Sequence, residues 1–173
     1  MPNRNRERPC RIRGITLIEL IMVMMVVAIL GVVLTRYQPT ETTVSIEADH
    51  LARDIRHMQM LAMTWGQSLR WTSAGASYNV SCVAAGPAPC NVAPVVDPAT
   101  GAAFNRLLES NVTVAGAGFD FDALGRPGTW AAGAPPTFTL SIAVPAASFT
   151  LTGGSETSTV SVARLTGFVS VVY

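Results

Sequence analysis

The stretch Arg13-Gly14-Ile15-Thr16-Leu17-Ile18-Glu19 leads into an apolar run, Ile15 to Leu34, that decides the organisation of the chain. As a helix rising about 1.5 Å per residue, this run reaches roughly 30 Å, the thickness of the hydrocarbon core of a bilayer. Glu19 is its only ionisable residue. A carboxylate inside a membrane costs at least about 2.5 kcal/mol unless it is paired. The sequence therefore predicts a membrane-spanning helix whose carboxylate needs a cationic partner.

Cleavage of the chain after Gly14 would create such a partner. The new α-amino group of Ile15 would lie four residues before Glu19, and the same amine on a neighbouring subunit could pair with it equally well. An ordinary secretory signal has an apolar region of about 7–15 residues followed by a small-x-small cleavage site. The run here is longer and continues into Val33-Leu34-Thr35-Arg36. A plain membrane anchor remains the alternative.

The residues from Arg13 to Glu19 resemble the class III signal of type IV pilins and type II secretion pseudopilins. The resemblance implies that a prepilin peptidase cuts after Gly14 and that Ile15 becomes the methylated N-terminus. It also implies that Glu19 guides the subunit into a helical filament. Two departures from the family pattern are Ile15, where phenylalanine is usual, and the position of Pro39, since the family often has a helix-kinking proline near position 36.

Charge in the first 14 residues predicts the orientation of the chain. This leader carries five arginines and one glutamate, and by the positive-inside rule it stays in the cytoplasm. The expected location is therefore the bacterial inner membrane, crossed once, with the C-terminal domain in the periplasm. The residues after Gly14 have seven arginines and ten carboxylates, a net charge of −3, so no general polyanion-binding surface is expected.

Cysteine usage fits an oxidising compartment. Cys10 belongs to the leader, while Cys82 and Cys90 are separated by the turn-rich segment Val-Ala-Ala-Gly-Pro-Ala-Pro. Periplasmic location favours a disulfide between them, worth about 2–3 kcal/mol if it is unstrained. Two free thiols are the alternative. No metal site is expected, because neither histidine lies near them at a ligand spacing.

The remaining chain predicts one compact α+β domain. Apolar residues between Val44 and Trp65 recur at alternating gaps of 4 and 3, which indicates an amphipathic helix that ends at Gly66. Its opposite, polar face is expected to carry Glu47, Asp49, Arg53, Arg56 and Gln59.

Short alternating runs rich in Thr, Val, Ser and Phe predict an antiparallel sheet after this helix. The expected strands are 68–73, 77–83, 111–114, 118–121, 137–144, 148–152 and 157–172, the last broken near 165–167. Residues 84–103 are expected to form a long connection. The predicted organisation is a leader (1–14), a transmembrane helix (15–36), an amphipathic periplasmic helix (37–66) and a β-rich globular domain (67–173), as in type IV pilins.

Two further stretches extend the family resemblance. Phe119-Asp120-Phe121-Asp122-Ala123-Leu124-Gly125-Arg126-Pro127 is similar to a signature of GspH/FimT-type minor pseudopilins and of mannose-sensitive-haemagglutinin-type minor pilins, and residues 54–63 resemble the helix of that group. From the residues alone, the first stretch indicates a hairpin with its two aspartates solvated and a local salt bridge from Arg126. A partner contact at a filament surface and a calcium site at Asp120 and Asp122 are the alternatives.

Together these features predict a minor pseudopilin or minor pilin of a type II secretion or type IV pilus-like filament. The implied partners are other pseudopilins or pilins, the prepilin peptidase and an inner-membrane platform protein. Neither a catalytic motif nor a cofactor-binding motif is present, and no enzyme activity is expected. The alternatives are an adhesin subunit and a minor pilin that captures DNA, although after Gly118 only Arg126 and Arg164 could serve the latter role.

Overall fold

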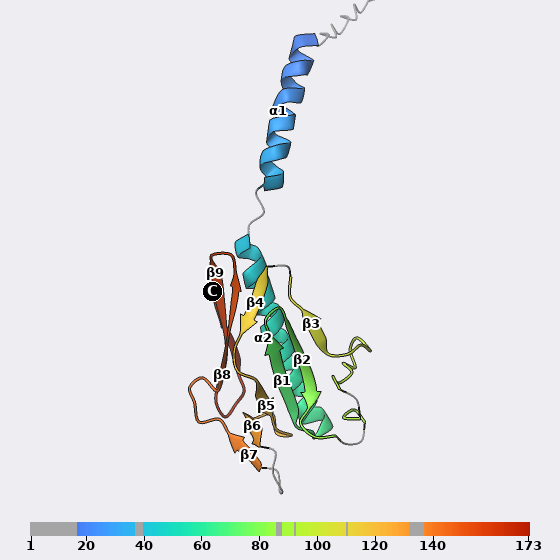
Figure 1. Ribbon diagram of the computed structural model, residues 1–173, viewed down its shortest axis with the longest axis vertical. Helices are drawn as coiled ribbons and strands as arrows, with labels where there is room; N and C mark the ends of the chain where they lie inside the picture. Colours follow the sequence, from blue (N-terminus) through green and yellow to red (C-terminus); the bar gives the residue numbers. More distant parts are fainter. Residues whose placement is uncertain (1–16, 37–39, 86–87, 92, 110, 132–136) are drawn as a thin grey trace, which may run out of the picture. The chain divides into compact units, whose positions relative to one another are not determined.

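The computed structural model describes residues 17–36, 40–85, 88–91, 93–109, 111–131 and 137–173 (Figure 1). The chain divides into two compact units, Met1–Gln38 and Pro39–Tyr173. The first unit contains helix α1, Leu17–Arg36. The second contains helix α2, Thr40–Trp65, and all the strands. Residues 37–39, which include Pro39, lie outside the described part of the chain.

Helix α2 forms where the sequence places its apolar stripe. Val44, Ala48, Leu51 and the other stripe residues as far as Ala62 are almost completely buried, while Trp65 at the end is partly buried. Gly66 follows with φ of +63°, the left-handed conformation that favours glycine at the end of a helix. The predicted amphipathic helix and its stop are therefore present.

The strands form two antiparallel sheets. The first has the order β3-β2-β1-β5-β6-β7. Its strands are β1 (Leu69–Ala74), β2 (Ser77–Cys82), β3 (Asn105–Leu107), β5 (Phe119–Phe121), β6 (Pro127–Ala131) and β7 (Thr137–Leu140). The second sheet has the order β10-β9-β8-β4. It consists of β4 (Val112–Ala115), β8 (Ala147–Gly153), β9 (Glu156–Val162) and β10 (Val169–Val172).

The core lies where α2 meets both sheets (Figure 1). Trp71 of β1 stacks on Tyr78 of β2 with ring centroids 4.4 Å apart, and Phe149 of β8 contacts Trp71 from the second sheet. All three rings are buried. Each of these aromatic side chains buries a large apolar area, so their contacts join the two sheets beneath α2.

The α+β class with antiparallel strands is confirmed, with some differences in detail. Strands β3 and β6 were not predicted: β3 has three residues, and β6 begins Pro127-Gly128, two residue types that are depleted in strands. The expected strand 137–144 ends at Leu140. The break in the last expected strand runs from residue 163 to 168, around the predicted position.

Candidate functional site

Helix α1 carries the predicted assembly residue, Glu19, in its first turn. Every side chain described on α1, from Leu17 to Val32, is exposed, and most of them are large and apolar. A surface of this size and polarity costs free energy in water. The described part of α1 is therefore apolar around its circumference, apart from residues such as Glu19.

The other two residues of the predicted processing site, Gly14 and Ile15, lie outside the described residues. Within the part of the chain that the structure describes, no helix is long and apolar enough to cross a membrane. Cleavage, methylation and the transmembrane span stay predictions.

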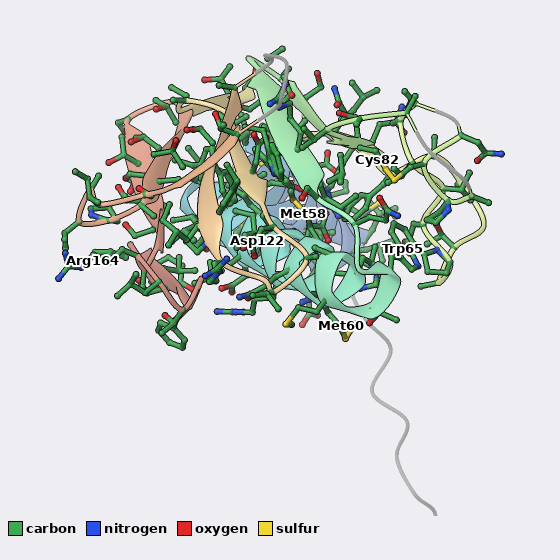
Figure 2. All side chains as sticks on the ribbon, turned by 90° about the horizontal axis from the view of Figure 1, so that it is seen from below. Met58, Met60, Trp65, Cys82, Asp122 and Arg164 are labelled. Carbon is green, nitrogen blue, oxygen red and sulfur yellow. A yellow bond between two sulfur atoms is a disulfide. The ribbon has the colours of Figure 1, made fainter. Side chains whose placement is uncertain are left out.

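Cys82 and Cys90 form the predicted disulfide, with their Cα atoms 5.5 Å apart. Cys82 is the last residue of β2, and Cys90 is buried in the connection that follows. Figure 2 places Cys82 beside this connection. The bond therefore fixes the start of the long loop between β2 and β3 against the first sheet.

Asp120 is the buried centre of an ion pair between strands. It lies directly across from Arg70 in the pairing of β1 with β5. Arg70 Nε and Nη2 donate to its two carboxylate oxygens at 2.8 and 2.9 Å, and the backbone N–H of Trp130 donates to Asp120 Oδ2 at 2.7 Å. The hydrogen bonds to Asp120 raise the pKa of Arg70. This fork geometry joins β1, β5 and β6 through a single carboxylate.

Asp122 organises the turn between β5 and β6. Its Oδ1 accepts hydrogen bonds from the backbone N–H groups of Leu124 and Arg126 at 2.9 and 2.8 Å. Its Oδ2 accepts one from Arg126 Nε at 2.7 Å. Gly125 completes the turn with φ of +74°, a conformation that costs an L-residue with a side chain free energy. The signature stretch therefore encodes a fixed hairpin turn.

The predicted local salt bridge of Arg126 is confirmed, but the prediction that both aspartates are solvated is wrong. Asp120 and Asp122 are 2% and 6% exposed. Asp120 pairs with Arg70 of β1, which lies fifty residues away in sequence and outside the local motif. No group of three or more His, Cys, Asp or Glu residues in the described part of the chain is arranged to hold a metal ion.

Glu47 was expected on the solvated face of α2 and is instead buried, only 2% exposed. Arg106 Nη2 of β3 donates to its Oε1 at 3.2 Å. The Arg106 side chain thus reaches a position of α2 that the sequence pattern assigns to solvent. The sequence offered only the arginine itself as a signal, because Arg106 is brought to Glu47 by the register of β3 on β2.

Tyr78 and Asp54 make a second contact between α2 and the first sheet. The Tyr78 hydroxyl donates to Asp54 Oδ2 at 2.6 Å. Burial, followed by the nearby Asp54 carboxylate, raises the pKa of Tyr78 well above its usual value. The phenol therefore stays protonated and keeps donating throughout the physiological pH range.

His57 connects α2 to the long loop between β2 and β3. Its Nε2 lies 3.0 Å from Asp97 Oδ1. Asp97 also accepts hydrogen bonds from the N–H of Ala99 and the hydroxyl of Thr100. Although partial burial raises the pKa of Asp97, these hydrogen bonds together lower it below its usual value. A cavity of about 490 Å³ lies beside this pair.

Comparisons with known proteins add a distant likeness. No protein-family model matches the chain, and no curated protein matches it. Its structure is similar to the type IV minor pilin FimU of Pseudomonas aeruginosa in space group P21, with 12% identity and a TM-score of 0.49 over 75% of this chain and 88% of that chain. The crystal form of FimU in space group P65 gives 12% identity and a TM-score of 0.46 over 73% and 90%.

Proposed function

We propose that this chain is a minor subunit of a type IV pilin-like filament, of the pseudopilin or minor pilin type. The observation that carries the proposal is α1, whose described side chains are all exposed and include one carboxylate, Glu19, among large apolar residues. Such a helix is suited first to a bilayer and then to the interior of a helical bundle of like helices. The sequence resemblance at Arg13 to Glu19 supports the same role.

In this proposal the prepilin peptidase removes residues 1–14 and Ile15 is methylated. The amine of Ile15, on the same or a neighbouring subunit, then neutralises Glu19. This pairing matters because a buried charge without a partner costs several kcal/mol. The subunit is held in the bacterial inner membrane by residues 15–34, and its α+β domain lies in the periplasm. Other pseudopilins or pilins and a platform protein are its partners, and it has no enzymatic activity.

Processing is tested by mass spectrometry of the protein extracted from membranes. The expected N-terminus is a methylated Ile15. Recovery of the chain with Met1 intact from cells with an active prepilin peptidase would contradict this step.

Assembly is tested by replacing Glu19 with valine. Glu19→Val leaves insertion and processing intact, because it makes the span more apolar, but reduces cross-linking to partner subunits several-fold or more, because the opposing amine loses its counter-charge. Glu109→Val removes another exposed carboxylate, outside both helices, and serves as the matched control with unchanged cross-linking. Equal assembly of Glu19→Val and wild type would show that the carboxylate has no pairing role.

A further inference from the structure

A group of exposed apolar side chains surrounds Gln59 near the C-terminal end of α2. They come from α2 itself, from the turn between β5 and β6 and from the turn between β9 and β10. We name this group the Gln59 surface, and each member is between 49% and 68% exposed: Met60, Met63, Leu124, Leu165 and Phe168.

Gln59 holds the three segments together. Its Nε2 donates to the carbonyl of Gly125 at 2.7 Å and to the carbonyl of Thr166 at 2.8 Å. A β-carbon at Gly125 would lie 2.8 Å from Met63 Sδ, so this turn packs directly against α2. Met60 is therefore next to Gln59 in sequence, and Met63 packs on the turn whose Gly125 carbonyl Gln59 binds. The other three members belong to the two turns that Gln59 binds.

The turn between β9 and β10 presents its apolar residues in an unfavourable backbone conformation. Leu165 has φ of +68°, a left-handed conformation that is unfavourable for a residue with a side chain. Hydrogen bonds from Ala163 N to Phe168 O (2.7 Å) and from Gly167 N to Ala163 O (3.0 Å) keep the turn closed. The fold thus maintains a strained turn whose leucine side chain makes little contact with its own core.

Three arginines border this surface, and two of them make no ion pair within the part of the chain that the structure describes. Arg56 Nη2 donates to the backbone carbonyl of Val169 at 2.8 Å, and Arg56 makes no ion pair with a carboxylate of the described residues. Arg126 is neutralised by Asp122. Arg164 is exposed and makes no ion pair among the described residues. Met60 and Arg164 project from the periphery of the domain in Figure 2, while Asp122 lies within its outline.

We propose that the Gln59 surface docks a segment of a partner protein in which apolar side chains are flanked by carboxylates. The apolar members supply the area that is desolvated, and Arg56 and Arg164 supply charges complementary to an acidic segment. A symmetric contact with a second copy would bring like charges together. This interaction does not involve α1 and would stand if the assembly role of Glu19 failed.

The same features argue against other occupants. Single-stranded nucleic acid needs a basic groove with several stacking rings, whereas Phe168 is the one aromatic member here. An anionic lipid surface is recognised by clusters of about four to eight basic residues, and this surface has two arginines that make no ion pair among the described residues. An acidic peptide with several apolar side chains is the occupant that fits five exposed apolar residues bordered by two arginines.

The direct test measures binding of a short fluorescein-labelled peptide that alternates Glu with Leu and Phe, using the full-length protein in detergent micelles. Two comparison peptides replace Glu with Lys or replace Leu and Phe with Ser, and protein-free micelles give the background. The proposal requires binding of the first peptide and at least about tenfold weaker binding of the other two. Equal binding of the Lys peptide would overturn the charge assignment, and absence of binding above background would overturn the proposal.

Variants locate the contact on the protein. Arg164→Glu and Phe168→Ser are each expected to weaken binding of the Glu peptide about five- to tenfold. Arg53→Glu on α2 and Leu107→Ser on β3 change an exposed arginine and an exposed leucine outside the Gln59 surface, and are expected to leave binding unchanged. If the control variants weakened binding as much as the test variants, the surface would be wrongly assigned.

A photo-cross-linking amino acid in place of Phe168, in cells that make the full chain, tests the physiological partner. The expected product contains a protein segment with carboxylates next to apolar residues, and the same cross-linker at Leu107 does not give it. Products with lipid, nucleic acid, a basic segment or a second copy of this chain would overturn the proposal, as would the absence of any product specific to position 168.

Discussion

Helices α1 and α2 distribute their apolar residues in opposite ways. Helix α1, Leu17–Arg36, is apolar around its circumference, and all its described side chains are exposed. Helix α2, Thr40–Trp65, is apolar along one stripe and buries that stripe on two sheets. The difference teaches that α2 buries its apolar stripe on the sheets of its own unit, whereas α1 has apolar side chains that its own unit leaves exposed.

Their carboxylates differ in the same way. Glu47 of α2 is buried and paired with Arg106, and Asp120 of the domain is buried and paired with Arg70. Glu19 of α1 is exposed and has no ion pair within the described residues. Removing a domain carboxylate should therefore destabilise folding, while removing Glu19 should affect only association.

Asp120→Ala gives the largest expected effect on folding. It leaves the Arg70 guanidinium and the Trp130 N–H without their acceptor in a partly buried site, at a cost of about 3–5 kcal/mol in the free energy of unfolding. Urea denaturation of the full chain in micelles, followed by tryptophan fluorescence, measures this loss. Glu19→Val should leave the transition unchanged, and an equal shift for both variants would remove the distinction between the two helices.

Leucine truncation in each helix tests the comparison directly. Leu51→Ala in α2 removes a completely buried side chain and should lower the free energy of unfolding by about 2–5 kcal/mol. Leu20→Ala in α1 removes a side chain that is 51% exposed, and the same measurement should change by less than about 0.5 kcal/mol. A loss above about 2 kcal/mol for Leu20→Ala would mean that α1 packs on its own domain.

Sequence patterns predicted α2 and most strands because their signals are local. The spacing of apolar residues fixes the buried stripe of a helix, and Gly66 marks the end of α2 through a conformation that glycine adopts freely. The disulfide followed from proximity in sequence and compartment. The strong alternation of residues 148–152 also predicted β8 to within one residue at each end.

The buried polar pairs could not be predicted, because each joins segments far apart in sequence. Arg70 meets Asp120 only through the register of β1 on β5. Arg106 reaches Glu47 only because the three-residue strand β3 pairs with β2. The Gln59 surface was missed for the same reason: its members belong to α2 and to two turns that a single glutamine brings together. Such sites depend on which residues of two paired strands lie opposite each other. The spacing of apolar residues along one segment does not show which partner a polar residue meets.

Replacing both cysteines of the disulfide should have a moderate effect on the domain. The double variant Cys82→Ser, Cys90→Ser removes the bond between two cysteines eight positions apart in sequence. It should lower the free energy of unfolding by about 2–3 kcal/mol. The loss is expected in the unit that contains α2, with processing at Ile15 unaffected. Urea denaturation measures it, and wild-type protein treated with reductant should reproduce it. Retention of full stability in both would mean that the loop is held by its other contacts alone.

The smallest expected effect concerns the loop that His57 and Asp97 attach to α2. Because the folded protein lowers the pKa of Asp97, the carboxylate contributes stability that is fully present above its unfolded pKa, near 4, and lost as the pH falls through its folded pKa. Asp97→Asn should therefore reduce stability at pH 6 by about 0.5–1.5 kcal/mol, the value of one typical hydrogen bond, and the difference from wild type should shrink below pH 3. Urea denaturation at both pH values measures this difference in the free energy of unfolding.

The control variant Asn91→Ala changes an exposed residue of the same loop and should have the stability of wild type at both pH values. A variant difference that grew on acidification would show that the folded protein raises the pKa of Asp97, the opposite of the direction expected from its hydrogen bonds.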